Sequence, residues 1–145
     1  MRLLAIACSV LLLGCSREPA VSVQVRAWAD PEQGVWEFQY PGPDGVWDTA
    51  DDRGSTNRAI LPAGRDVTLQ IESAGPPATI CISDLGSSEL SPTSFQIPSS
   101  ALREKEKLEF WCGEYVGMKT TEMRGSISVL DSSDFDLQLS KLSPW

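Results

Sequence analysis

The sequence contains no histidine among its 145 residues. Histidine is the usual base of Ser-His-Asp and Cys-His catalytic sites, so both arrangements are excluded. A mononuclear blue-copper site, which needs two histidines beside a cysteine, is excluded as well. No glycine-rich phosphate loop is present either. These absences remove the most familiar routes from this sequence to a catalytic function.

Basic side chains are also scarce. The chain has 12 Lys and Arg against 20 Asp and Glu, which gives a formal net charge of −8. A nucleic acid partner is not expected, because phosphates require a positive surface. The acidic balance favours either a basic partner, through electrostatic steering, or simple solubility. Charge alone leaves both alternatives open.

The apolar run at the start of the chain, from Leu3 to Leu13, is too short for a membrane-spanning helix, which needs roughly 20 residues. It has the length of the apolar segment of a secretory signal. The run ends in Gly14-Cys15, which resembles the lipobox of bacterial lipoproteins. The alternative is a plain signal peptide with a chance cysteine.

The lipobox resemblance implies a signal peptide over residues 1–14 and a lipidated tether over residues 15–20. It also implies diacylation of Cys15, and two or three acyl chains anchor a protein durably. Ser16 in the second mature position implies sorting to the outer membrane of Gram-negative bacteria. We therefore predict a location in the cell envelope, on the periplasmic side.

Four cysteines are present, and only two of them lie beyond the N-terminal segment. Cys8 is removed with the signal and Cys15 carries lipid. Cys81 and Cys112 remain in an oxidising compartment, where two leftover cysteines most often form one disulfide. We predict this bond, which requires the two Cα atoms to lie within bonding range.

Several short segments alternate apolar and polar residues, which is the pattern of half-buried strands. Val67, Leu69 and Ile71 give the clearest example. Gly and Pro separate the segments, so the pattern predicts an all-β sandwich over residues 21–142. A short helix is predicted within 131–142, with Ser132 or Ser133 as its N-cap. The predicted strands cover residues 21–28, 35–40, 59–61, 67–71, 79–82, 93–97, 107–111 and 126–130, with polar loops at 44–57 and 84–91.

The segment from Cys112 to Met123, followed by Arg124-Gly125, resembles the CuA loop of cytochrome c oxidase subunit II. The family pattern is Cys-x-Glu-x-Cys-Gly-x-x-His-x-x-Met. The positions that match are Cys112, Glu114, Gly117 and Met123. The positions that depart from the pattern are Val116, in place of the second bridging cysteine, and Thr120, in place of a histidine.

The resemblance extends over most of the chain that follows the tether. Residues 36–41 are similar to the family's Trp-x-Phe-x-Tyr-Pro strand, and residues 61–67 to its Leu-Pro-x-Gly-x-x-Val turn and strand. Residues 73–80 occupy the place of the stretch that carries the other histidine, where this chain has Ala78 and Thr79. The resemblance implies a cupredoxin-like Greek-key β-sandwich.

A dinuclear copper centre needs two bridging thiolates, and this chain offers one of them and no imidazole. The resemblance therefore implies a subunit II-like domain without a functional CuA centre, and we predict neither an enzyme nor a bound cofactor. The function it implies is that of a structural, assembly or binding partner of a respiratory membrane complex.

Two metal-binding alternatives stay open. The sulfur atoms of Cys112, Met118 and Met123 suit Cu(I). The loop from Asp44 to Asp52 contains four carboxylates and a glycine, which suits Ca²⁺ without following the EF-hand pattern. The calcium candidates are Asp44, Asp48, Asp51 and Asp52.

Five tryptophans are many for a chain of this size. In the family, aromatic residues near the copper loop pass electrons from cytochrome c. The simpler interpretation here is that Trp36 is part of the core, while Trp47 and Trp145 are exposed.

Overall fold

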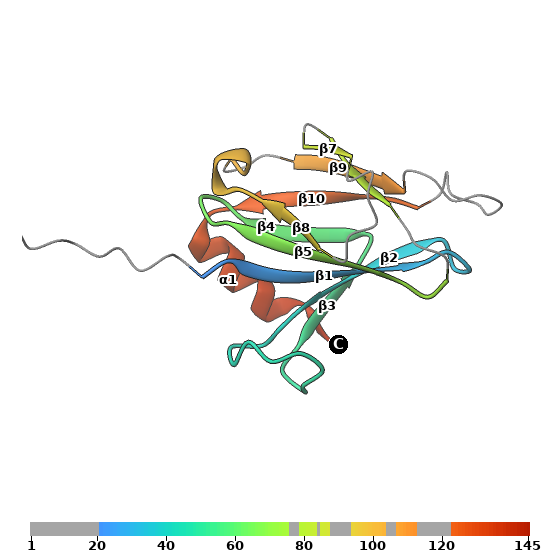
Figure 1. Cartoon of the computed structure of the whole chain (residues 1–145). Coiled ribbons are helices and arrows are strands. Elements are labelled where there is room, and N and C mark those ends of the chain that lie inside the picture. The colour runs from blue at the N-terminus through green and yellow to red at the C-terminus, as the bar shows by residue number, and fades with distance from the viewer. Residues whose placement is uncertain (1–20, 76–78, 84, 88–93, 104–106, 113–122) are drawn as a thin grey trace, which may run out of the picture.

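The computed structural model describes residues 21–75, 79–83, 85–87, 94–103, 107–112 and 123–145. Its strands form two sheets that lie face to face (Figure 1). The first sheet has the spatial order β11-β3-β2-β1-β5-β8 and the second has the order β4-β10-β9-β6-β7. The predicted all-β sandwich is confirmed.

The strand bounds follow the sequence pattern closely. The first sheet consists of β1 (Val23–Asp30), β2 (Val35–Tyr40), β3 (Arg53–Thr56), β5 (Val67–Ser73), β8 (Ser94–Ile97) and β11 (Ser143–Pro144). The second consists of β4 (Arg58–Pro62), β6 (Ile80–Ile82), β7 (Gly86–Ser87), β9 (Lys107–Cys112) and β10 (Arg124–Leu130). The helical elements are the short 3-10 helix η1 (Ser99–Ala101) and the helix α1 (Ser132–Lys141).

The core lies between the two sheets because alternate residues of each strand face inward. Val25, Ala27 and Ala29 of β1 are fully buried. From the facing sheets, Phe38 and Phe110 meet edge to face with their ring centroids 5.1 Å apart. Burying an aromatic side chain of this size stabilises a fold by about 1.5–3 kcal/mol. The alternation of apolar and polar residues in the sequence therefore correctly predicts which side chains face the core.

The two sheets are joined through Asn57, which lies between β3 and β4 with a positive φ of 55°. Its backbone N–H donates to the Trp36 carbonyl at 2.7 Å, and its side-chain Oδ1 accepts from the Trp36 N–H at 2.8 Å. The Asn57 carbonyl accepts from the N–H of Ser126 in the second sheet. One residue thus fixes the crossing of the chain from one sheet to the other.

Tyr40 provides a second link between the sheets. Its side chain is buried, and its hydroxyl oxygen accepts a hydrogen bond from the Ile60 N–H at 2.8 Å. Burial raises the pKa of the Tyr40 hydroxyl, because the charged form is desolvated. The hydroxyl therefore remains neutral and acts as a hydrogen-bonding group within the core.

Two predictions about local structure were wrong. The polar loops at 44–57 and 84–91 contain the strands β3 and β7, whose short polar sequences show no alternation. The N-cap of α1 is Asp131, and not Ser132 or Ser133. Asp131 has extended backbone angles, and its carboxylate accepts a hydrogen bond from the Asp134 N–H at 2.9 Å.

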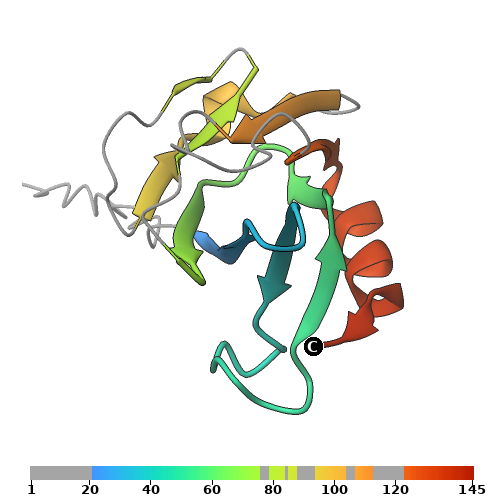
Figure 2. The ribbon, with the colours of Figure 1, turned by 90° about the vertical axis from the view of Figure 1, so that its right-hand side faces the viewer.

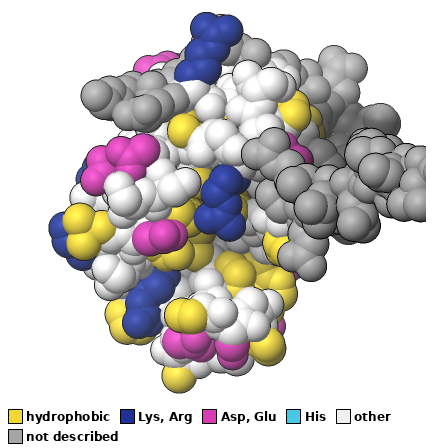
Figure 3. All heavy atoms as spheres, turned by 90° about the vertical axis from the view of Figure 1, so that its left-hand side faces the viewer, with side chains coloured by type: hydrophobic (Ala, Val, Ile, Leu, Met, Phe, Trp, Pro, Cys, Tyr) yellow, Lys and Arg dark blue, Asp and Glu magenta, His cyan; other side chains and the backbone are white. Residues whose placement is uncertain are grey.

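The helix α1 packs beside β4 and β10 and buries Phe135 (Figure 2). The regular structure continues past residue 142, because Ser143 and Pro144 pair with β3. Among the described residues, no helix has the length and apolar character needed to cross a membrane. On the face shown in Figure 3, basic side chains lie among acidic and apolar ones.

Candidate functional site

The two ends of the predicted metal loop lie at the same end of the second sheet. Cys112 ends β9, and Met123 directly precedes β10. The two strands are antiparallel, and the last pair of their register is Arg124 opposite Trp111, so Cys112 and Met123 each lie one residue beyond that pair. The segment predicted as a metal loop therefore begins and ends at neighbouring strands of this sheet.

Most of the loop lies outside the described residues. This applies to Glu114, Val116, Met118 and Thr120, and upstream to Ala78. Met123 is described, and its side chain is only 1% exposed and belongs to the hydrophobic core. A thioether in this position packs as an apolar core side chain.

The two cysteines of the domain lie on neighbouring strands, β6 and β9. The register places Cys81 opposite Trp111 and Cys112 opposite Ile80. The strand pairing thus brings the cysteines to neighbouring strands with an offset of one residue, and Cys81 is buried. The disulfide between them stays a prediction.

The acidic loop is organised around Asp52, whose side chain is fully buried. Its carboxylate accepts hydrogen bonds from the Gln39 side-chain amide at 2.7 Å and the Asp48 N–H at 2.8 Å. It also accepts from the Thr49 hydroxyl at 3.1 Å and the Gly42 N–H at 3.2 Å. Four donors satisfy this carboxylate, so its burial carries no uncompensated charge.

The pKa of Asp52 reflects two opposing effects. Burial raises the pKa because it disfavours the charged form. The hydrogen bonds from Asp48, Thr49, Gly42 and Gln39 stabilise the charged form and together outweigh burial, so the pKa lies below its usual value. Asp52 is therefore ionised at neutral pH and acts as the internal anchor of the loop.

The other calcium candidates have further partners, although Asp51 shares the Thr49 hydroxyl with Asp52. Asp48 forms an ion pair with Arg26 at 3.2 Å, and Asp51 accepts from the Thr49 hydroxyl at 2.6 Å. Asp44 accepts from the Val46 N–H at 2.9 Å, which closes an exposed turn. Among the described residues, no three His, Cys, Asp or Glu side chains are arranged to hold a metal ion. The calcium site stays a prediction.

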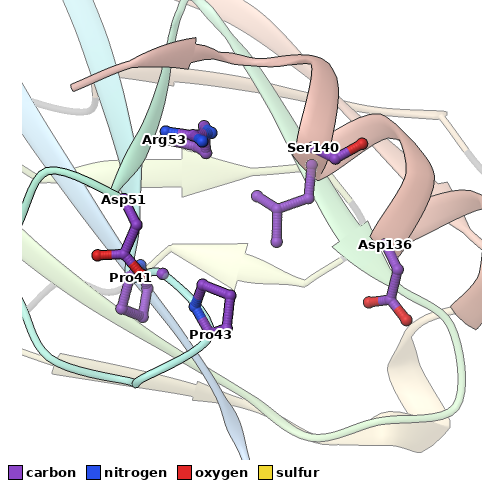
Figure 4. A pocket seen from close by; sticks show the side chains of 8 residues that line it. Pro41, Pro43, Asp51, Arg53, Asp136 and Ser140 are labelled. Atoms are coloured by element: carbon purple, nitrogen blue, oxygen red, sulfur yellow. The ribbon is translucent and has the colours of Figure 1, made fainter.

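A hollow of about 500 Å³ lies between the acidic loop and α1. Figure 4 shows Asp136 and Ser140 projecting from the helix on one side, with Pro41, Pro43 and Asp51 on the other. Arg53 also lines the hollow and donates to the Asp52 carbonyl at 3.1 Å. The surface is mainly apolar, and no sequence motif predicted it.

Comparisons with known proteins support the fold. No family model and no curated protein matches the sequence. Among solved structures, the periplasmic domain of cytochrome oxidase subunit II (CoxB) of Bradyrhizobium japonicum is 13% identical, with a TM-score of 0.63. The match covers 83% of this chain and 92% of that domain.

A second similar structure is the mixed disulfide intermediate between the thioredoxin-like TlpAs and subunit II of cytochrome c oxidase. It is 11% identical with a TM-score of 0.54, and the match covers 86% of this chain and 93% of the other. Likeness at this identity shows the fold. The chain thus has the cupredoxin-like architecture of oxidase subunit II periplasmic domains, which confirms that prediction.

Proposed function

We propose that this protein is a lipid-anchored, extracytoplasmic cupredoxin-like protein without a CuA centre, which acts as a structural or assembly partner of a respiratory membrane complex. The observation that carries the proposal is the conjunction of a subunit II-like fold with a loop that lacks the ligands. The fold matches 92% of the CoxB periplasmic domain, whereas the chain contains no histidine.

The position of Cys112 and Met123 supports this proposal. They lie one residue beyond the last pair of the β9–β10 register, at the two ends of the segment that would carry the CuA ligands. Val116 and Thr120 replace two of those ligands in the sequence. A scaffold that keeps the hairpin and loses the ligands can retain a protein-binding role but not the electron-transfer role.

The proposed location rests on the N-terminal sequence. Gly14-Cys15 at the end of the apolar run supports lipidation, and Ser16 supports sorting to the outer membrane. Lipidation at Cys15 would tether the sandwich to a membrane surface without a spanning helix. The subunit II domain trapped in a mixed disulfide with a thioredoxin-like protein is a precedent for a protein partner on this fold.

The test is co-purification from native membranes. The full chain, tagged at the C-terminus, would be solubilised in mild detergent, captured, and analysed by quantitative mass spectrometry. We expect enrichment of respiratory oxidase subunits over a control lipoprotein with the same tag and anchor. Equal recovery of those subunits with both baits would contradict the proposal.

A Cu(I) protein is the second candidate, and it is favoured by the juxtaposition of Cys112 and Met123. Metal analysis with thiol counting separates the two functions. One equivalent of copper and two thiols that are titratable without reductant would support the copper protein and exclude the disulfide. Thiols that are titratable only after reduction, without copper, would exclude the copper site.

A further inference from the structure

The outer face of the first sheet carries a group of half-exposed aromatic and charged side chains. On β1, Arg26 and Trp28 face away from the core, while their neighbours Val25 and Ala27 are buried. The register places Trp28 between Glu37 of β2 and Glu72 of β5. An indole on an exposed sheet face, with a carboxylate on each side, is a combination that packing alone does not require.

Trp145 is held over the same face by the end of the chain. Ser143 and Pro144 pair with β3, and the Trp145 N–H donates to the Asp52 carbonyl at 3.1 Å. The indole ring lies against Gly54, where an added Cβ would stand 2.3 Å from a ring carbon. The ring is nevertheless 48% exposed. The structure therefore fixes an exposed tryptophan in one position.

Trp28 and Trp145 line one hollow of about 250 Å³, and Glu37 is part of its lining. A second hollow of about 400 Å³ runs towards β3 and β11 and shares Glu37 and Trp145 with the first. Glu37 thus lies at the junction of the two hollows. Two indoles beside one carboxylate form an aromatic-walled site of a size that accepts a small ligand.

Among the described residues that line the first hollow, Arg26 is the cation, and it is already neutralised. Arg26 lies 3.2 Å from carboxylate oxygens of both Asp48 and Glu72, and it donates to Gln39 Oε1 at 3.0 Å. Its guanidinium carbon also lies 4.4 Å from the centre of the Trp47 ring. On this face, two carboxylates and an indole ring therefore surround the guanidinium group of Arg26.

Glu37 differs from the other two carboxylates of the face. Within the described part of the chain, it forms neither an ion pair nor a side-chain hydrogen bond. With Glu37, Asp48 and Glu72 opposed only by Arg26, the lining of the hollow carries an excess of negative charge. Charge complementarity and the indole faces therefore select the same ligand class, an organic cation.

We propose that the hollow between Trp28 and Trp145 binds an organic ammonium group, with Glu37 as its counter-ion. The cation would lie against the indole faces, as Arg26 does against Trp47, and the unpaired carboxylate of Glu37 would neutralise it. An alkylated ammonium suits this site better than a metal ion, because its methyl groups also bury apolar surface against the rings.

The test is calorimetric titration of the full-length protein, in non-ionic detergent, with choline chloride. The control ligand is the uncharged choline isostere dimethylbutanol, in which carbon replaces nitrogen. We expect saturable binding of choline and no binding of the isostere or of potassium chloride. Equal binding of choline and isostere, or no binding of either, would overturn the proposal.

Paired variants locate the site. Glu37→Gln should weaken choline binding roughly 2- to 5-fold, the range expected for a solvent-accessible ion pair. Trp145→Ala should weaken it roughly 2- to 30-fold, the range of cation–π contacts. The matched controls are Glu109→Gln and Trp111→Ala, an exposed carboxylate and an exposed tryptophan on β9 of the other sheet.

Unchanged choline affinity in Glu37→Gln would overturn the assignment of the site, because this substitution keeps the shape of the side chain. Equal weakening by the two control variants would overturn it as well. Glycerophosphocholine distinguishes the source of the ammonium group. Binding as tight as that of choline assigns a lipid headgroup, and tighter binding of choline assigns a free amine.

Discussion

At the scale of single residues, Asp52 explains why a strongly acidic loop folds into a defined shape. A buried carboxylate is costly unless hydrogen bonds compensate for the lost hydration. Asp52 receives bonds from two backbone N–H groups, one hydroxyl and one side-chain amide. The loop therefore folds around its own charge, and the neighbouring aspartates are left to face solvent or Arg26.

Replacing this anchor should destabilise the protein. Asp52→Ala removes the acceptor for the Gly42 and Asp48 N–H groups and for the Gln39 amide. We expect the free energy of unfolding to fall by about 3–5 kcal/mol, because each of these three donors costs at least about 1 kcal/mol when it is left unsatisfied and single substitutions rarely cost more than about 5 kcal/mol. Urea unfolding at neutral pH measures the change. The control Asp136→Ala, on the exposed surface of α1, should change stability by less than about 0.5 kcal/mol.

The same residue predicts how stability depends on pH. The pKa of Asp52 is lower in the folded protein than in the unfolded chain, so the unfolded chain binds a proton more readily. The contribution of Asp52 is complete above the unfolded pKa of about 3.9 and is lost as the pH falls through the lower folded pKa. The pKa of Asp131, the N-cap of α1, is also lowered by its hydrogen bonds and acts in the same direction.

Urea unfolding of the wild type and of Asp52→Asn, measured between about pH 5 and pH 2, checks this dependence. The difference in stability between the two proteins should be largest at the upper end and should shrink as the pH falls. A difference that stays constant over the range would show that the carboxylate charge does not stabilise the fold.

At the scale of elements, the sequence pattern was informative where apolar residues alternate and silent elsewhere. Strands β1, β2 and β5 each bury one apolar face, and their positions were predicted to within a few residues. Strand β3, with the sequence Arg-Gly-Ser-Thr, was missed because backbone pairing with β2 and β11 holds it and no apolar side chains mark it. Because β3 was not predicted, its pairing with β11, which positions Trp145, could not be predicted either.

A packing constraint on β10 gives a further prediction. At Gly125 an added Cβ would stand 2.2 Å from the Asn57 carbonyl oxygen and 2.3 Å from the Phe110 ring. Gly125→Ala must therefore displace both the sheet-crossing residue Asn57 and a core aromatic, Phe110. We expect a loss of about 1–3 kcal/mol in the free energy of unfolding, typical of overpacking.

Thermal and urea unfolding of Gly125→Ala measure this loss. The control is Ser128→Ala, on the same strand at a partly exposed position, which should stay within about 0.5 kcal/mol of wild type. Equal stability of the two variants would mean that the chain crossing at Asn57 can move without cost. In that case, the glycine would not be needed to seat β10 against the crossing.

At the scale of the whole molecule, fold and site differ in how far the sequence predicts them. The turn and strand motifs around residues 36–41 and 61–67 pointed to the sandwich, and the solved structures agree. The aromatic-walled hollow could not be predicted, because Trp28, Glu37 and Trp145 are brought together only by the register of β1, β2 and the end of the chain. The spacing of these three residues along the sequence does not indicate that they lie close together in the fold.

The N-terminal segment provides the last prediction, which tests the proposed lipid anchor. If Cys15 is the acylated residue, Cys15→Ala should abolish incorporation of tritiated palmitate and leave the signal segment uncleaved by the lipoprotein pathway. The matched control is Cys8→Ala, a cysteine inside the apolar run that the proposed cleavage would remove. This variant should incorporate tritiated palmitate and be recovered in the membrane fraction to the same extent as the wild type. Palmitate incorporation into Cys15→Ala would mean that the anchor lies elsewhere, and the tether of residues 15–20 would then lose its assigned role.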